Sequence, residues 1–140
     1  MANLSFSAAI EDWVRRVKGA EEAIFKASCQ ELVTQLNALV PVSTGFLRSS
    51  LLASTTQMPV LSLANPGGAG FSPDVGQIEL VIAGAELGDV LYLGYTANYG
   101  AYVHYGANGR PGRPWVDMVA QRWQSIVSAK AEEVKSRLGL

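Results

Sequence analysis

Residues 5–40 read SFSAAIEDWVRRVKGAEEAIFKASCQELVTQLNALV and carry the strongest structural signal in the chain. Their apolar side chains recur in steps of mostly three and four, at Phe6, Ile10, Trp13, Val17, Ala20, Ile24, Cys29, Leu32, Val33, Leu36 and Leu39. That period predicts one long helix. Ser5 or Ser7 suits its N-cap, and Pro41 ends it. We expect Gly19 to weaken, kink or split its middle.

Residues 114–138 predict a second long helix by the same criterion. Pro114 suits the first helical position, and Gly139 follows the last turn as a stop signal. We expect Trp115 and Trp123 to anchor this helix to a sheet.

The segments between the two helices favour strands. Residues 46–55, 77–84 and 90–95 are each predicted as a strand, and the last two are expected to pair as a hairpin through a short Gly-containing loop. We therefore predict an α+β fold in one domain, residues 1–140. It comprises a long N-terminal helix, a small and mainly antiparallel sheet with a long loop, and a long C-terminal helix packed on the sheet.

The long loop spans residues 57–76, where three prolines and four glycines leave no visible period. Two interpretations stay open. Its apolar content favours an arm that orders against a neighbouring subunit, whereas its length and composition also suit an ordinary surface loop.

Composition narrows the function classes. The 140 residues carry a net charge of −1, which argues against bulk binding to nucleic acid or to anionic membranes. The single Cys29 excludes a disulfide framework and a Cys-based zinc site. No apolar run has the length of a membrane span, and residues 1–9 lack the pattern of a signal peptide. Charged residues make up 16%, so either Ser, Thr, Gln and Asn cover the surface or partners bury part of it.

Residue types that carry catalysis are sparse. One His and one Cys give no Ser-His-Asp triad, no Cys-His pair and no metal cluster, and no phosphate-binding glycine loop is present. We expect no enzymatic activity, no cofactor and no metal. His104 as the general base of a small hydrolase is the alternative, and a half-buried histidine in a Tyr-rich turn is the interpretation we favour.

Residues 109–114 contain the tripeptide Gly-Arg-Pro twice and resemble an AT-hook, whose arginine lies in the DNA minor groove. A DNA-binding accessory protein that uses Arg110 and Arg113 is therefore an alternative function. We favour a rigid loop whose Pro114 starts the last helix, because the basic flanks of an AT-hook are missing.

The tyrosines are concentrated in one segment. All five fall within 14 residues, at Tyr92, Tyr95, Tyr99, Tyr102 and Tyr105. Tyrosine is common at protein interfaces, so we assign Tyr99, Tyr102 and Tyr105 to packing or to an interface, with Gly106 ending the turn.

Charge is also uneven along the chain. Residues 41–100 carry a net −3 and residues 101–140 a net +3. Opposite charges on two faces suit head-to-tail contacts between copies, and neutralisation within one copy is an equally open alternative. Arg48 is the only basic residue between positions 27 and 109, which favours a particular acidic partner across an interface.

Three segments together resemble a known family. Residues 40–50, VPVSTGFLRSS, are similar to its V-P-V-x-T-G-x-L-R-x-S signature, in which we expect Gly45 to supply a backbone angle and Leu47 to point inward. Residues 98–106, NYGAYVHYG, resemble its Y-A-x-Y-V-E-F-G segment, and residues 113–116, RPWV, its x-P-F-L start of the last helix. The family is that of tailed-phage neck or tail-completion proteins, the head–tail joining group of lambda-like and HK-type siphophages.

The resemblance implies a non-enzymatic virion protein, assembled in the host cytoplasm, that forms a ring between the capsid connector and the tail, with a hexamer favoured. Its implied partners are further copies of itself, the connector or stopper and the tail tube, with genome DNA passing through the lumen without sequence-specific binding and no membrane involved. A hexameric tail terminator is the nearest alternative. The interface candidates are Thr44, Gly45, Leu47, Arg48, Tyr99, Tyr102, Tyr105, Gly106, Arg110, Arg113, Pro114 and Trp115.

Overall fold

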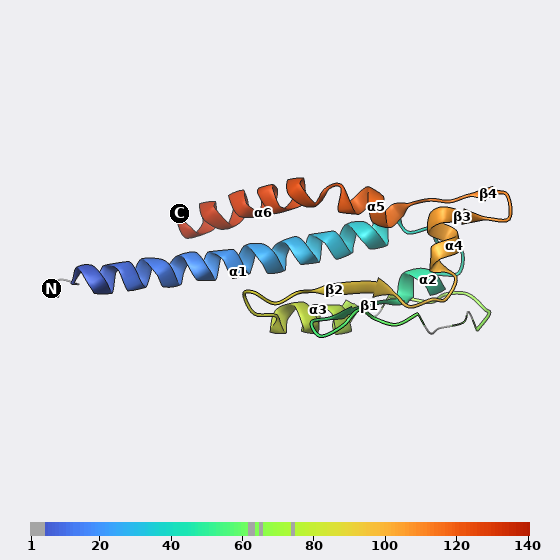
Figure 1. Cartoon of the computed structure of the whole chain (residues 1–140), viewed down its shortest axis with the longest axis horizontal. Coiled ribbons are helices and arrows are strands. Elements are labelled where there is room, and N and C mark those ends of the chain that lie inside the picture. Colours follow the sequence, from blue (N-terminus) through green and yellow to red (C-terminus); the bar gives the residue numbers. More distant parts are fainter. Residues whose placement is uncertain (1–4, 62–63, 65, 74) are drawn as a thin grey trace.

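The computed structural model describes residues 5–61, 64, 66–73 and 75–140. It has the expected α+β class, with two long helical segments and a small antiparallel sheet (Figure 1). The elements in chain order are α1 (Phe6–Leu39), α2 (Phe46–Ser49), β1 (Leu51–Ser54), α3 (Val75–Gly84), β2 (Tyr92–Tyr95), α4 (Gly100–Tyr105), β3 (Gly106–Ala107), β4 (Arg110–Pro111), α5 (Trp115–Ala120) and α6 (Trp123–Leu138).

The long N-terminal helix is confirmed. The Ser5 hydroxyl accepts a hydrogen bond from the Ala8 N–H at 3.1 Å and caps the start of α1. At the other end the Val40 N–H donates to the Leu36 carbonyl at 2.9 Å, and the helix ends before Pro41. The expected split at Gly19 is wrong, because α1 runs unbroken for 34 residues, and Figure 1 shows no sharp kink along it.

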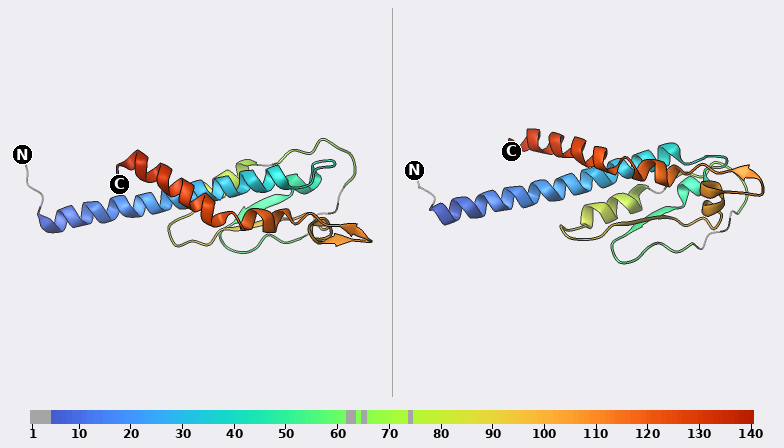
Figure 2. Two further views of the ribbon diagram at one scale, coloured as in Figure 1. Left: turned by 90° about the horizontal axis from the view of Figure 1, so that it is seen from above. Right: turned by 45° about the horizontal axis from the view of Figure 1, so that its top comes forward.

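Two faces of α1 are used for packing, and α1 therefore lies between two layers (Figures 1 and 2). The sheet and α3 cover one face, where Cys29 and Val33 pack with Leu51 and Ile78 in one core cluster. The other face lies against α5 and α6. Burying two separate stripes of one helix fixes its rotation relative to both layers.

The sheet pairs different strands from those predicted. Strands β1 and β2 are antiparallel, with Leu51 opposite Tyr95 and Ser54 opposite Tyr92. The strand predicted at 77–84 and its hairpin with 90–95 are wrong, because this segment is the helix α3. A short apolar run does not distinguish a buried strand from a helix by its period.

The side chains of α3 explain why helix prevails. Ile78 and Ile82 lie one turn apart and are both 1% exposed, whereas Leu80 between them is 77% exposed. The segment therefore buries one helical stripe rather than alternate residues. The Gln77 side-chain amide occupies the edge of β1. Its oxygen accepts a hydrogen bond from the Ala53 N–H at 3.1 Å, and its nitrogen donates one to the Ala53 carbonyl at 2.8 Å.

The strand predicted for residues 46–55 is correct only in its second half. The helical turn α2 precedes β1 and buries both Phe46 and Leu47. Gly45 starts that turn in a left-handed conformation, with φ 88°. Sequence propensity favoured a strand because the segment is rich in Ser and Thr, and the glycine turn overrides that preference.

The C-terminal helix is divided in two. The N–H groups of Gln121 and Arg122 donate to the carbonyls of Asp117 and Val119 in a tight turn between α5 and α6. The predicted packing on the sheet holds for α5, because the Trp115 ring meets the Tyr95 ring at 5.3 Å. In contrast, α6 lies along α1 and Trp123 is 37% exposed, so the expected sheet anchor at Trp123 is wrong.

Smaller predictions also have outcomes. Pro114 is the N-cap of α5 rather than its first residue, and Gly139 caps α6 in a left-handed conformation as expected. Residues 106–111 form the short β3–β4 hairpin. Within the long loop the predictions for residues 62, 63, 65 and 74 lie outside the described residues, and its last two residues belong to α3. No helix in the described ranges has both the length and the apolar character needed to span a membrane.

Two weakly acidic side chains packed in the core, those of Cys29 and Tyr95, make the stability of the fold sensitive to high pH. Burial raises the pKa of the Cys29 thiol from 9.0 to about 11 and that of the Tyr95 hydroxyl from 10.0 to about 12. Both groups hold their protons more tightly in the folded state, so their contribution to stability is complete below pH 9 and is lost as the pH rises through the folded pKa values. We expect the urea midpoint to fall between pH 9 and pH 11.

The Cys29→Ala variant is the matched control for this pH effect. This variant lacks the group with the lower of the two folded-state pKa values, so its urea midpoint should fall less over the same pH range. A wild-type midpoint that stays flat from pH 8 to pH 11 contradicts the argument.

Candidate functional site

The Thr44–Gly45 turn holds the end of the long loop against the core. The Thr44 carbonyl accepts hydrogen bonds from the N–H groups of Gly70 and Phe71 at 3.1 and 3.2 Å. The Phe71 carbonyl lies so close to Gly45 that no side chain fits there. The Phe71 ring meets the Phe46 ring at 5.2 Å. These motif residues therefore organise the fold, and Leu47, 5% exposed, lies in the core as predicted.

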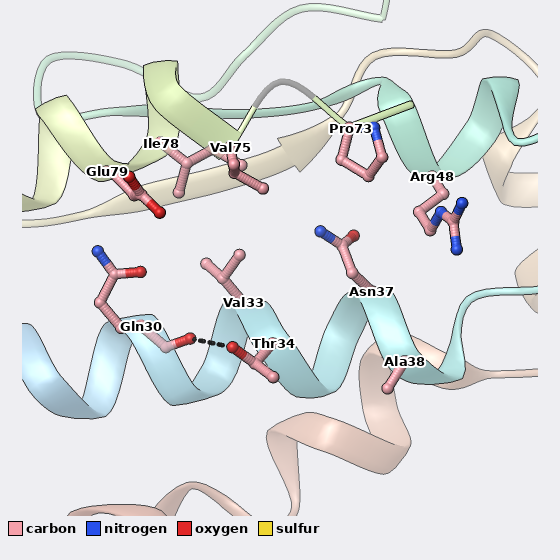
Figure 3. A pocket seen from close by; sticks show the side chains of 10 residues that line it. All are labelled: Gln30, Val33, Thr34, Asn37, Ala38, Arg48, Pro73, Val75, Ile78 and Glu79. Atoms are coloured by element: carbon pink, nitrogen blue, oxygen red, sulfur yellow. Dashed lines mark hydrogen bonds between the residues drawn. The ribbon is translucent and has the colours of Figure 1, made fainter. Parts of the chain in front are cut away.

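Arg48 lines a cleft between α1 and α3 with a volume of about 450 Å³ (Figure 3). Its Nε atom is buried and has no hydrogen-bond partner in the described part of the chain, whose ion pairs all lie elsewhere. Arg48 and the acidic Glu79 lie at opposite ends of this cleft in Figure 3. The Asn37 amide between them uses its oxygen to accept from the Tyr95 hydroxyl at 3.2 Å.

The Arg48 cleft can accept a carboxylate. A guanidinium with an unused Nε–H binds a carboxylate oxygen through a charge-assisted hydrogen bond. The acidic partner expected for Arg48 is not among the residues around it that the structure describes, so that expectation stays a prediction.

A second and more apolar hollow, which we call the groove, lies beside α4 and α5. Its volume is about 370 Å³. The lining comes from six segments of the chain and consists of Leu36, Leu51, Met58, Pro59, Leu61, Leu93, Gly94, Tyr95, Gly100, Ala101, His104, Tyr105, Trp115, Val116 and Asp117. Several apolar side chains of this lining are largely exposed: Met58 (57%), Leu61 (58%) and Tyr105 (77%).

Polar atoms without partners line the groove. His104 is 7% exposed and Trp115 is 1% exposed, yet both ring nitrogens of His104 and the Trp115 Nε1–H have no hydrogen-bond partner among the described residues. The Asp117 carboxylate is 3.8 Å from His104 Nε2, beyond hydrogen-bond distance. Buried polar groups are nearly always paired, so these atoms indicate that something polar completes the groove.

The predicted tyrosine cluster separates into two kinds of residue. Tyr95 and Tyr99 pack inside, Tyr95 on Trp115 and Tyr99 stacked on Phe46 at 6.3 Å. Tyr102 and Tyr105 are exposed on α4, at 66% and 77%. The exposed pair is therefore available for an interface, whereas Tyr95 and Tyr99 are half-buried and packed against the core.

The two arginines of the Gly-Arg-Pro repeats have different surroundings. Arg113 donates from Nε to the Leu39 carbonyl at 2.9 Å and so caps the C-terminus of α1, where a cation is favourable. Arg110 is exposed in β4, where it lies opposite Ala107 of β3. The repeats form a tight hairpin and a helix start rather than the extended arm of an AT-hook.

Sequence reasoning missed a third surface at the N-terminal end of α1. Phe6, Ile10 and Trp13 were predicted as part of the apolar face, but they are 83%, 46% and 56% exposed. The length of α1 was the available signal, because a helix of 34 residues cannot be covered along its whole length by α6, which has 16 residues.

Within the described residues no group of three His, Cys, Asp or Glu side chains is arranged to hold a metal ion. Comparison with known proteins finds no family model, no curated protein and no solved structure that matches this chain.

Proposed function

We propose that this chain is a structural virion protein of a tailed bacteriophage, which forms a ring at the head–tail junction and joins the capsid connector to the tail. The three motif segments of the sequence support this proposal, and one structural observation carries it most. That observation is the groove, an apolar hollow whose lining residues include two with unpaired buried polar atoms and several largely exposed apolar side chains.

The groove has the composition of a subunit contact. Exposed aromatic and aliphatic side chains around a concave surface are typical of interfaces, and Tyr and Trp dominate their energetics. A segment of a neighbouring copy brings apolar side chains for the lining and backbone or side-chain polar groups for His104 and Trp115. One contact then covers the exposed apolar side chains and also supplies hydrogen-bond partners for the unpaired polar atoms.

The distribution of charge favours a head-to-tail contact. Glu86 and Asp89 lie in the turn between α3 and β2, and Arg110 lies in the β3–β4 hairpin, at the other end of this part of the molecule (Figure 1). A contact between two different ends of successive copies closes into a ring when the rotation permits. A hexamer between the connector and the tail tube, with DNA in its lumen, is the arrangement we propose.

The test uses two residues of equal exposure. Tyr105 beside the groove and Leu80 on α3 are both 77% exposed. We expect the wild-type chain to form rings in negative-stain images and to join tailless particles. Tyr105→Asp should reduce ring formation at least about tenfold, because it places a charge in an apolar contact, and Leu80→Asp should leave it within about twofold.

The outcomes are distinct. Equal loss in both variants means that general solubility, not the groove, governs assembly. A wild-type chain that stays monomeric at every concentration and never joins phage particles contradicts the proposed function. In a phage that lacks the protein, tailless heads are expected from a neck protein, and overlong tails indicate a tail terminator instead.

A further inference from the structure

The first three turns of α1 extend beyond the rest of the fold. Helix α6 ends at Leu138, whose carbonyl accepts from the Arg16 guanidinium at 3.2 Å. Both views in Figure 2 show the beginning of α1 continuing past this point. We call residues 6–15 the α1 tip. No other helix or strand of the described chain lies along it.

The apolar stripe of the tip continues the seam that α6 covers. The stripe of the tip has steps of four, three and four residues, at Phe6, Ile10, Trp13 and Val17. Steps of three and four continue along the same face of α1 at Ala20, Ile24, Ser28, Glu31 and Gln35. Gln35 accepts from the Arg122 guanidinium at 3.1 Å, and Glu31 and Gln35 share a hollow with α6, which marks this face as the one toward α6. Ala20 is buried at 5% exposure, whereas the tip residues are open. The element that fits the open part of the seam is therefore another helix.

The stripe is free of charge. On a helical projection Asp12 and Arg15 lie on the side opposite Ile10, and Glu11 lies about 100° away from it. Asp12 pairs with Arg15 at 3.6 Å while both remain in solvent. A second helix can cover the stripe without removing any charge from water, which is the usual cost of such burial.

We propose that the α1 tips of two copies of this chain pair antiparallel about a two-fold axis, so that each covers the stripe of the other. With Ile10 at the axis, Ile10 meets the partner's Ile10 and Phe6 meets the partner's Val14. Trp13 lies opposite the partner's Ser7, so that a large side chain meets a small one. The tip is about 15 Å long, and in this register the partner's Phe6 comes close to Leu138, which is 45% exposed.

This pairing does not depend on the proposed function, because it uses none of the groove residues. Three helical turns make a contact at the small end of specific interfaces. We therefore expect a dimer that forms in the micromolar range. It leaves the groove and the hairpin end open for ring contacts.

The test is disulfide trapping in the Tyr105→Asp background, where the groove contact is absent. Ile10→Cys lies at the two-fold axis, so mild oxidation should give a disulfide-linked dimer within minutes. Arg15→Cys lies on the opposite side of the same helix and should give at least about tenfold less dimer. The native Cys29 does not interfere, because it is only 2% exposed.

Sedimentation of variants without an introduced cysteine, in the same Tyr105→Asp background, completes the test. Ile10→Asp should weaken the dimer at least about tenfold, and Arg15→Asp should not. The proposal is overturned if Ile10→Cys and Arg15→Cys trap equally, if the dimer survives Ile10→Asp, or if the parent chain is monomeric at several hundred micromolar. If the wild-type chain forms this dimer but no rings, the proposed function alone is contradicted.

Discussion

Replacing Trp115 with alanine is expected to lower the free energy of unfolding by about 3 kcal/mol, and urea denaturation measures the change. The indole is 1% exposed and belongs to the core cluster that contains Leu36, Leu47 and Val119. It contacts the Tyr95 ring at 5.3 Å and the His104 ring at 5.5 Å, and so ties α5 to the sheet and to α4. Its removal leaves a cavity where three elements meet.

The expected loss lies at the lower end of the range for buried tryptophan. The Trp115 Nε1–H has no hydrogen-bond partner in the described structure, and the alanine variant no longer has to bury that donor. Part of the lost packing energy is offset in this way. In the ring that we propose, a neighbouring group that accepts from this donor would make the same substitution more costly than in the free chain.

Trp123→Ala is the control. Trp123 is the same residue type on the next helix, but it is 37% exposed, so we expect a loss of about 1 kcal/mol. Equal losses at both positions would mean that the α5 contact with the sheet contributes nothing beyond ordinary helix burial. The sequence alone predicted one anchoring role for both tryptophans, and the break at Gln121–Arg122 separates them.

Much of the helical architecture could be predicted because its signals are local. Ser5 and Pro41 mark the ends of α1, and Gly139 marks the end of α6, by capping and by steric exclusion that do not depend on the rest of the fold. The residues between them repeat the helical period for many turns. Segments of this kind carry enough periods to exclude a strand.

The segment 77–84 could not be assigned from the sequence, because its state depends on a distant partner. Its run of apolar residues suits a strand until the edge of β1 is occupied by the Gln77 side chain. A helix satisfies the backbone hydrogen bonds of this segment internally and lets Ile78 and Ile82 be buried together. Which of the two prevails is decided by tertiary contacts between residues 24 positions apart.

The candidate site shows the same division between local and tertiary information. Gly45 was identified because a turn after a helix needs a particular backbone angle, and its φ of 88° confirms that. The groove was not predicted, because its lining is assembled from segments that no linear motif connects. The exposed α1 tip was missed for a different reason: an apolar period predicts a face but does not say how much of that face the chain can cover.

Gly45→Ala is expected to lower the free energy of unfolding by about 3 kcal/mol, through two effects that the structure separates. A positive φ of 88° is unfavourable for alanine, and a Cβ at this position overlaps the Phe71 carbonyl oxygen. The backbone of the Phe71 segment must move away, and its hydrogen bonds to the Thr44 carbonyl weaken with it. Urea denaturation measures the total, and protease cleavage in the long loop should become faster as its end detaches.

Gly88→Ala isolates the first effect. Gly88 has a φ of 98°, but a Cβ there meets open space, so only the backbone strain of about 1 kcal/mol applies. The difference between the two variants, about 2 kcal/mol by subtraction, is the cost of displacing the Phe71 segment. If both variants lose the same stability, then displacing the Phe71 segment has no measurable cost, and Gly45 serves only to allow the backbone angle of the turn. If Gly45→Ala alone also accelerates loop cleavage, then the Thr44–Gly45 pair holds the end of the long loop to the core. The core cluster in question is the one that supports the groove through Leu36 and Trp115.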